Sequence, residues 1–220
     1  MAWTDIDPAE EPAFNEWYNH EHMRDRVLGV PGFLRGRRFV ALSGEPKYLA
    51  LYEAVGPEVF SSDSYLRLIG TPDPKSHHFI LNFRQPIRTV ARLVASFGES
   101  EGASLALLPL LRGADWRAAR DRLVTSAIPA LVGFRGIVAA QLIERDDEAA
   151  SGSTRRHVRQ GDRSLAAALL VESAEAEFSL ADLSSRVGGV PQPDPDFVPS
   201  MFKLLYRVSP RPSGNQGRSA

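Results

Sequence analysis

Apolar and polar residues alternate along the first half of the chain in the pattern of short strands separated by amphipathic helices. The expected order is strand, helix, strand, strand, helix and strand, over residues 2–6, 8–28, 34–42, 48–55, 57–69 and 87–97. Asp7 is placed to cap the first helix, and Gly29 and Pro31 end it. This βαββαβ order predicts a four-stranded sheet with both helices on one face.

The same order is expected again after the glycine-bearing residues 98–102. Its elements are expected over residues 103–111, 116–131, 134–144, 164–172, 174–186 and 201–208. The first helix of this half has apolar residues three and four apart, as one buried stripe requires: Trp116, Ala119, Leu123, Val124, Ala127, Ile128 and Leu131. We therefore expect one unit over residues 1–98, a second over 103–208, and a disordered tail over 209–220.

A repeated motif supports this duplication. The Gly-Phe run that begins at Gly32 returns at Gly133, an offset of 101 residues. Shifting His22 by the same offset gives Leu123, which belongs to the apolar stripe, so the ring of His22 is expected to face the sheet. Because the second copy has ordinary core and surface residues where the first has histidines, we expect the first half to carry the function.

The remaining face of each predicted sheet is rich in Leu, Val, Ala and Tyr and has to be covered. The matching face of the other unit is the simplest cover. Two units packed sheet to sheet in this way would enclose a cavity between them, and this cavity is the expected ligand site.

The composition narrows the kinds of partner and site. The chain has 26 Lys and Arg against 27 Asp and Glu, a net charge of -1, which leaves no overall field for nucleic acid or an anionic membrane. The absence of cysteine excludes disulfides, thiolate catalysis and cysteine-ligated metal centres. The N-terminus lacks the order of a signal peptide and no long apolar stretch follows it. We expect a cytoplasmic protein that binds small molecules, and the sequence leaves open whether it forms a homodimer.

Several motifs follow one another in the first half: an aromatic helix with Tyr18 and His22, a Val-Pro-Gly-Phe turn at 30–33, Arg38, and a tyrosine-bearing strand at 46–53. This arrangement resembles the EthD-like proteins of the dimeric α+β barrel superfamily over roughly residues 3–97. The resemblance implies an α+β fold in which two tandem ferredoxin-like βαββαβ units form an intrachain dimeric α+β barrel. The superfamily includes cyclases, dehydratases, lactone isomerases, cofactor-free oxygenases and haem-binding proteins, so the fold leaves the reaction open.

His22 is the leading candidate for a catalytic residue, with Tyr18 one helical turn before it. An imidazole that faces the sheet can act as an acid or base near neutral pH, and a tyrosine hydroxyl can orient a carbonyl or hydroxyl group of a ligand. The alternative is that His22 is a core residue satisfied by one hydrogen bond.

The other histidines offer weaker candidates. His20 is two residues from His22 and lies on another face of the helix, so the pair is not expected to hold a metal. His77 and His78 follow the helix-breaking residues 72–74. They could supply a second proton carrier, a ligand contact through His78 or a haem ligand, or they could be an exposed loop feature.

Aromatic and basic side chains complete the set of candidate ligand-binding residues. Tyr48 and Tyr52 share one face of their strand, which either lines the cavity or packs under the helices. Trp17 adds aromatic surface suited to a flat apolar ligand. Arg38 points away from Arg37 and, if buried, would need a carboxylate from the protein or from a ligand.

These observations favour a cofactor-independent enzyme of the isomerase or lyase type, which includes dehydratases and cyclases. It would move a proton on a small hydrophobic or aromatic molecule held in the barrel. Two alternatives remain open at this point. One is a non-catalytic binding or accessory protein of a catabolic pathway, and the other is a haem-binding barrel.

Overall fold

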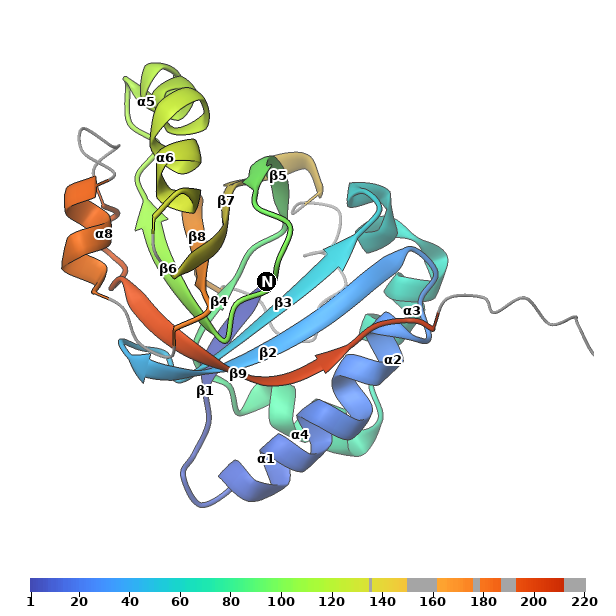
Figure 1. Ribbon diagram of the computed structural model, residues 1–220. Helices are drawn as coiled ribbons and strands as arrows, with labels where there is room; N and C mark the ends of the chain where they lie inside the picture. Colours follow the sequence, from blue (N-terminus) through green and yellow to red (C-terminus); the bar gives the residue numbers. More distant parts are fainter. Residues whose placement is uncertain (135, 150–161, 176–178, 187–192, 212–220) are drawn as a thin grey trace, which may run out of the picture.

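The computed structural model describes residues 1–134, 136–149, 162–175, 179–186 and 193–211 (Figure 1). Most of the predicted tail, residues 212–220, lies outside these ranges. The first part of the chain forms β1 (Ala2–Asp5), α1 (Glu11–Trp17), the π-helical turn η1 (Tyr18–His22), α2 (Met23–Val27), β2 (Phe33–Ser43), β3 (Tyr48–Ala54), the 3-10 turn η2 (Pro57–Ser61), α3 (Asp63–Gly70), α4 (Pro74–Leu81) and β4 (Arg84–Arg88). It continues with β5 (Ala91–Phe97), β6 (Ser104–Leu110), α5 (Trp116–Arg122), the π-helical turn η3 (Leu123–Ala127), α6 (Ile128–Val132), β7 (Ile137–Arg145), β8 (Ala167–Ser173), α8 (Leu180–Arg186) and β9 (Ser200–Val208).

Capping side chains explain where several helices begin. The first helix starts later than predicted, because the Asp7 carboxylate accepts a hydrogen bond from the Ala9 amide (2.9 Å) in a separate turn before α1. Helix α4 was missed by the hydrophobic pattern. Asp73 caps it by accepting from the amides of Lys75 (2.9 Å) and Ser76 (3.0 Å), with Pro74 in its first turn.

The strands form one nine-stranded antiparallel sheet with the order β4-β1-β3-β2-β9-β6-β8-β7-β5. Strand β9 lies between β2 and β6 and hydrogen-bonds to both, so it joins the two halves edge to edge. The expectation of two separate sheets that meet only face to face is therefore wrong. Each half instead supplies a strand that pairs with the other half: β5 pairs with β7, and β9 pairs with β2.

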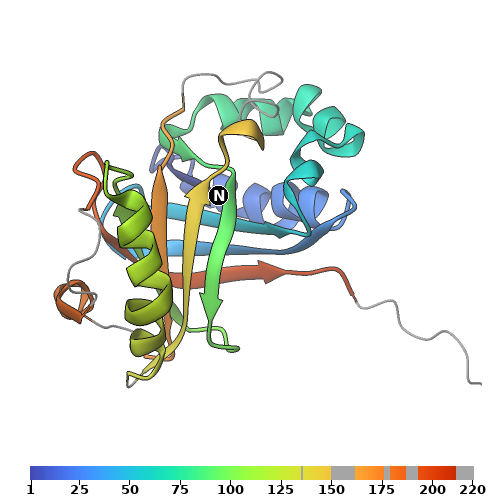
Figure 2. The ribbon, with the colours of Figure 1, turned by 90° about the horizontal axis from the view of Figure 1, so that it is seen from above.

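The predicted strand over residues 87–97 is two strands with different partners. Strand β4 pairs with β1, whereas β5 pairs with β7 at the opposite end of the strand order. Only Thr89 and Val90 separate β4 from β5, so the first and last strands of the sheet are consecutive along the chain and the sheet curls back on itself (Figure 2). This arrangement gives the free edge of β7 a hydrogen-bonding partner.

Helices cover the outer face of the curled sheet (Figure 1). Helices α1 to α4 pack against β1 to β3 through a core that includes Phe14, Trp17 and Tyr48. Helices α5, α6 and α8 cover β6 to β8 through a second core that includes Leu123 and Leu169. The face of β3 that carries Tyr48 and Tyr52 thus packs under the helices. Strand alternation alone had left open whether this face lies under the helices or lines the barrel interior.

Apolar side chains cover much of the described inner face of the curled sheet. A third core runs through it and contains Trp3, Phe39, Leu49, Leu51, Ile87, Leu105, Leu107, Leu165, Ala168, Leu170 and Phe202. The rings of Trp3 and Phe202 meet edge to face with their centroids 5.7 Å apart. Large apolar side chains from both halves thus occupy this part of the space in which we expected a ligand cavity.

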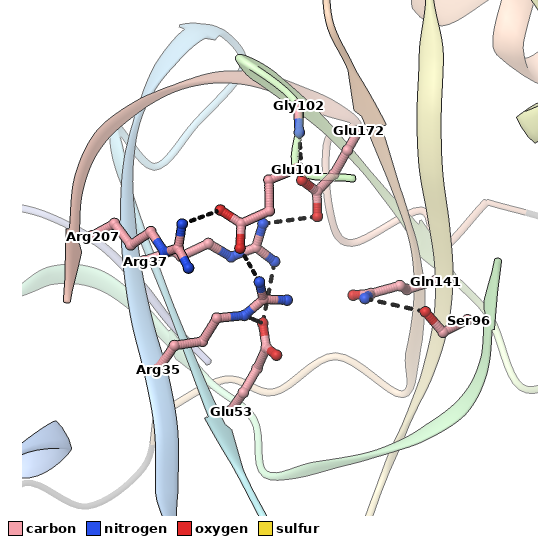
Figure 3. Close-up of polar contacts among 9 residues, drawn as sticks. All are labelled: Arg35, Arg37, Glu53, Ser96, Glu101, Gly102, Gln141, Glu172 and Arg207. Carbon is pink, nitrogen blue, oxygen red and sulfur yellow. Dashed lines mark hydrogen bonds and ion pairs between the residues drawn. The ribbon is translucent and has the colours of Figure 1, made fainter. Parts of the chain in front are cut away.

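Arginine and glutamate side chains form an ion-pair network at one end of this interior (Figure 3). Arg37 of β2 donates to Glu172 of β8 at 2.8 Å, and the side chains of both residues are at most 4 % exposed. Arg37 also contacts Glu53 of β3 at 3.3 Å. The second oxygen of Glu172 accepts from the Gly102 amide at 2.9 Å. The network links the two halves of the chain, and the Arg37–Glu172 pair is its most buried contact.

The turns before β2 and β7 show how the two halves correspond. Gly32 and Gly136 both have a positive φ. The carbonyl oxygen of Gly32 accepts from Val55, which follows β3, and that of Gly136 accepts from Ala174, which follows β8. The structural offset here is 104 residues, not the 101 of the Gly32 and Gly133 sequence match. The helices before these turns, α1 and α5, begin 105 residues apart. Leu123 is therefore the counterpart of Tyr18 rather than of His22.

Replacing Glu172 with Gln should strongly destabilise the fold, because the amide keeps the size of the side chain but leaves the buried Arg37 short of a counter-charge. We expect a loss of about 3–5 kcal/mol in the free energy of unfolding, measured by urea denaturation. Glu21→Gln is the matched control, since it breaks the half-exposed Lys75–Glu21 pair and should cost less than about 1 kcal/mol. Equal losses in the two variants would contradict a structural role for the network.

Candidate functional site

A cavity of about 80 Å³ lies between the helices of the first half and the outer face of the sheet. Its walls come from η1, α2, β2, β3, η2, α3, the end of α4 and the β4–β5 connection. Aromatic and aliphatic side chains supply most of the surface: Phe33, Tyr52, Phe60, Tyr65, Ile80 and Phe83. Tyr18, His22 and Arg26 add polar groups from one stretch of helix, and Arg88 and Asp162 add charges. The cavity thus lies on the helix side of the sheet, not inside the barrel.

The π-helical turn η1 places Tyr18 and His22 together. It begins at Tyr18 and ends at His22, and the Met23 amide donates to the Tyr18 carbonyl across one residue more than in an α-helix. Both side chains are buried, and their ring centroids are 4.6 Å apart. The sequence prediction that His22 faces the sheet is therefore confirmed.

His22 has one charged neighbour in direct contact, Arg26, which lies one helical turn after it. The Nη1 group of Arg26 is 3.1 Å from both Nδ1 and the carbonyl oxygen of His22. Because a guanidinium can only donate, Nδ1 has to be the acceptor and the neutral ring carries its proton on Nε2. The ring also packs against Trp17, with centroids 4.4 Å apart.

Burial lowers the pKa of His22 well below its ordinary value, and the positive charges of Arg26 and Arg38 lower it further. The imidazole is therefore neutral at physiological pH. A neutral imidazole can accept a proton or donate a hydrogen bond, which are the two properties that acid–base chemistry requires.

Tyr18 and Tyr52 stand together at the cavity wall. Their hydroxyl oxygens are 3.4 Å apart, with Tyr52 donating to Tyr18. Burial raises the pKa of Tyr18, and it raises the pKa of Tyr52 well above the ordinary value. Both phenols therefore keep their protons, and Tyr18 is left with a hydroxyl proton that it can donate to a ligand.

Arg38 does not line this cavity, although the sequence analysis considered it as a ligand-binding residue. It is fully buried beneath the helix, and its guanidinium lies 4.5 Å from the ring centroids of Tyr18 and Tyr48. It donates to the amide oxygens of Asn15 (2.7 Å) and Asn19 (3.0 Å). Asparagine oxygens and aromatic faces take the place of the carboxylate that we expected such a residue to need.

Three other predicted residues lie outside the cavity wall. Trp17 is fully buried and donates through its indole to the Ser76 hydroxyl at 3.0 Å. Tyr48 donates to Glu11 and borders a separate, wider cleft of about 500 Å³ near the β2–β3 turn. His78 is exposed on α4, with Nε2 2.6 Å from a carboxylate oxygen of Glu10.

The remaining histidines face solvent. His20 is exposed and lies 3.7 Å from Glu16, and His77 is exposed on α4. Among the described residues, no three His, Cys, Asp or Glu side chains come together in a way that could hold a metal ion. Across the same ranges, no helix is long and apolar enough to cross a membrane.

Sequence reasoning missed Arg26 and the aromatic rings of η2 and α3. The four-residue spacing from His22 to Arg26 could have identified the arginine as a neighbour on the same helix face. Phe60 and Tyr65 could not have been found in this way, because only the packing of η2 and α3 against β2 brings them to the cavity.

Solved structures with a similar fold exist, although neither a protein-family model nor a curated protein matches the sequence. An anthrone oxidase-like protein is 10% identical with a TM-score of 0.63, covering 99% of this chain and 94% of that chain. A candidate monooxygenase of Lactobacillus acidophilus NCFM is 8% identical with a TM-score of 0.53, covering 94% and 93%. A candidate monooxygenase of Fusobacterium nucleatum subsp. nucleatum ATCC 25586 is 10% identical with a TM-score of 0.53, covering 94% and 92%.

At these identities the similarity establishes the fold alone. The chain is an α+β protein whose nine-stranded antiparallel sheet resembles those of dimeric α+β barrel proteins. This confirms the predicted α+β architecture, and membership of the superfamily stays a prediction. The closer likeness to EthD-like proteins stays a prediction.

The low pKa of His22 predicts a pH dependence of stability. The imidazole of His22 takes up a proton below about pH 6.5 in the unfolded chain, whereas in the folded protein it resists protonation. The contribution of His22 to the free energy of unfolding is therefore fully present above that pH and declines as the pH falls. The slope attributable to His22 is at most about 1.4 kcal/mol per pH unit. Urea unfolding from pH 8 to pH 5 should show a shallower decline for His22→Gln than for wild type. Parallel curves for wild type and His22→Gln would show that His22 titrates normally in the folded protein.

Proposed function

We propose that this protein is a cofactor-independent enzyme that moves a proton on a small aromatic or flat apolar molecule bound in the helix-side cavity. The observation that carries the proposal is a neutral, buried imidazole in contact with a protonated tyrosine at the wall of an aromatic cavity. This combination provides a proton acceptor, a hydrogen-bond donor and an apolar surface within a few ångströms of one another.

The cavity volume limits the part of the ligand that is enclosed. A cavity of about 80 Å³ is smaller than the roughly 150 Å³ of an engineered cavity that takes up benzene, and far below the ~300 Å³ of a typical ligand pocket. The cavity therefore encloses less than a whole benzene ring, and only one edge of an aromatic ligand enters it. Phe60 and Tyr65, which contact each other edge to face, form the wall that sets this limit.

The polar groups have distinct roles in this mechanism. The imidazole of His22 accepts a proton from a carbon next to a ligand carbonyl, and the C–H electron pair moves to the carbonyl oxygen to give an enolate. Tyr18 donates to that oxygen, and the guanidinium of Arg26 stabilises its negative charge. Return of the proton at another carbon gives an isomerase, and loss of a leaving group gives a dehydratase or lyase.

The names of the similar structures favour one further reaction of the enolate, its oxidation. An anthrone oxidase-like protein and two candidate monooxygenases share the fold, and an electron-rich enolate can transfer electrons to dioxygen as the oxidant. Oxidation by dioxygen is therefore the second candidate, and it requires the same first proton transfer. A haem-dependent reaction has less support, because His77 and His78 lie on the outer surface of α4.

We also infer that the two halves arose as tandem ferredoxin-like units that together reproduce an α+β barrel within one chain. Support comes from the π-helical turns η1 and η3, which occupy the same place after α1 and α5. The shared glycine turns at Gly32 and Gly136 support it further. Only the first unit pairs its π-turn with acid–base side chains, since η3 begins at Leu123 and ends at Ala127.

Proton transfer can be tested without knowing the final product. The protein would be incubated in D2O with small aromatic ketones and phenols, anthrone among them, and deuterium uptake at carbon followed by NMR. His22→Ala should slow the exchange by at least about 100-fold, the range expected for loss of a general base. His20→Ala is the control and should exchange at the wild-type rate, because His20 is exposed on the opposite helix face.

Three outcomes separate the candidate functions. Exchange without oxygen consumption supports an isomerase or lyase, and exchange with oxygen consumption supports the oxidase. Saturable binding without exchange would contradict catalysis and favour the non-catalytic binding protein.

A further inference from the structure

We propose that Arg26 recognises a carboxylate on a small aromatic substrate, and that binding of this carboxylate releases Nδ1 of His22 to act as the base. The inference rests on the proposed function and adds to it a substrate class and a means of activating the base. It starts from an inconsistency in the ligand-free site, where the nitrogen that should accept a proton already accepts a hydrogen bond.

Arg26 is a cation without a carboxylate partner within the described parts of the chain. Both of its hydrogen bonds run through Nη1, one to Nδ1 and one to the carbonyl oxygen of His22, each at 3.1 Å. Its Nε and Nη2 donate to no other described residue. The arginine is only partly buried and lines the cavity, so these donors remain available to a ligand.

The present arrangement blocks His22 as a base. Nδ1 is occupied by Arg26, and Nε2 carries the ring proton, so neither nitrogen has a free lone pair to take a proton from a ligand. In this state His22 can only donate a hydrogen bond, through Nε2. A base at this position requires Arg26 to move away from Nδ1.

A carboxylate is the group best suited to move Arg26. The planar guanidinium binds a carboxylate through two parallel hydrogen bonds, which are stronger than a bond to a neutral imidazole. Arg26 would exchange its weak acceptor on His22 for this stronger one and leave Nδ1 free. The bound anion would also offset the positive charge of Arg26, one of the causes that lower the pKa of His22.

Substrate recognition and base activation would then be one event. A neutral molecule of the same shape would fill the aromatic cavity but leave Nδ1 occupied. The small enclosed volume admits only one edge of an aromatic ring, and a benzoate-like acid is the simplest member of the class.

Binding of benzoate and of its neutral counterpart benzamide tests the recognition step without any assay of turnover. Isothermal titration calorimetry on wild type should show benzoate binding at least about tenfold more tightly than benzamide, a difference typical of one charge-assisted pair. Arg26→Met should remove this preference while keeping the benzamide affinity, and Arg26→Lys should restore part of it. Arg24→Met, which removes an exposed charge from the same helix, should behave as wild type.

The activation step is tested by 15N NMR of the His22 ring. Benzoate should change the Nδ1 signal from a hydrogen-bonded to a free acceptor and raise the pKa of His22, whereas benzamide should do neither. Arg26→Met should produce the same two changes without any ligand. A His22 ring that responds equally to both compounds would overturn the activation step.

The outcomes also distinguish this proposal from the proposed function. Equal affinity of wild type for benzoate and benzamide would overturn the carboxylate site, and the function would stand if deuterium exchange still depended on His22. Absence of both binding and exchange would overturn the two proposals together. A benzoate preference that survives in Arg26→Met would show that another cation holds the carboxylate.

Discussion

The change of partner between β4 and β5 is the constraint on which the rest of this structure depends. An unpaired strand edge leaves a row of backbone donors and acceptors exposed, and folded proteins avoid this state. Here the segment from Arg84 to Phe97 begins on β1 and ends on β7, so one stretch of chain covers an edge in each half. Strand β9 does the same between β2 and β6. The two halves therefore cannot separate without breaking strand pairs in both.

This closure brings the inner faces of the two halves into contact. Curling the sheet brings the inner faces of both halves so close that Trp3, Phe39 and Phe202 fill the space between them. Arg37 and Glu172 pair with each other in this interior, although Nε of Arg37 has no hydrogen-bond partner. Among the described residues, the cavity lined by His22 lies on the outer face, where α2, η2 and α3 meet the sheet.

Much of the local structure could be predicted from the sequence, since strand alternation and helix periodicity act over a few residues. The strand pairing could not, because the partner of β5 is decided by edges that are distant in the chain. The prediction for His22 is instructive. The sequence match paired it with Leu123, whereas the structure pairs Leu123 with Tyr18, four residues earlier. Four residues are about one helical turn, so the wrong counterpart still identified the right helix face.

The second π-turn, η3, shows what joining two units in one chain makes possible. In a symmetric assembly of identical subunits, every site occurs in each copy and every substitution affects all of them. Here η3 has the backbone of η1 but carries Leu123 and Ala127 in place of the tyrosine and histidine. The first half thus carries a polar helix face at this place, whereas the second half carries an apolar one. A single chain permits such a difference, because each of the two turns can be substituted without changing the other.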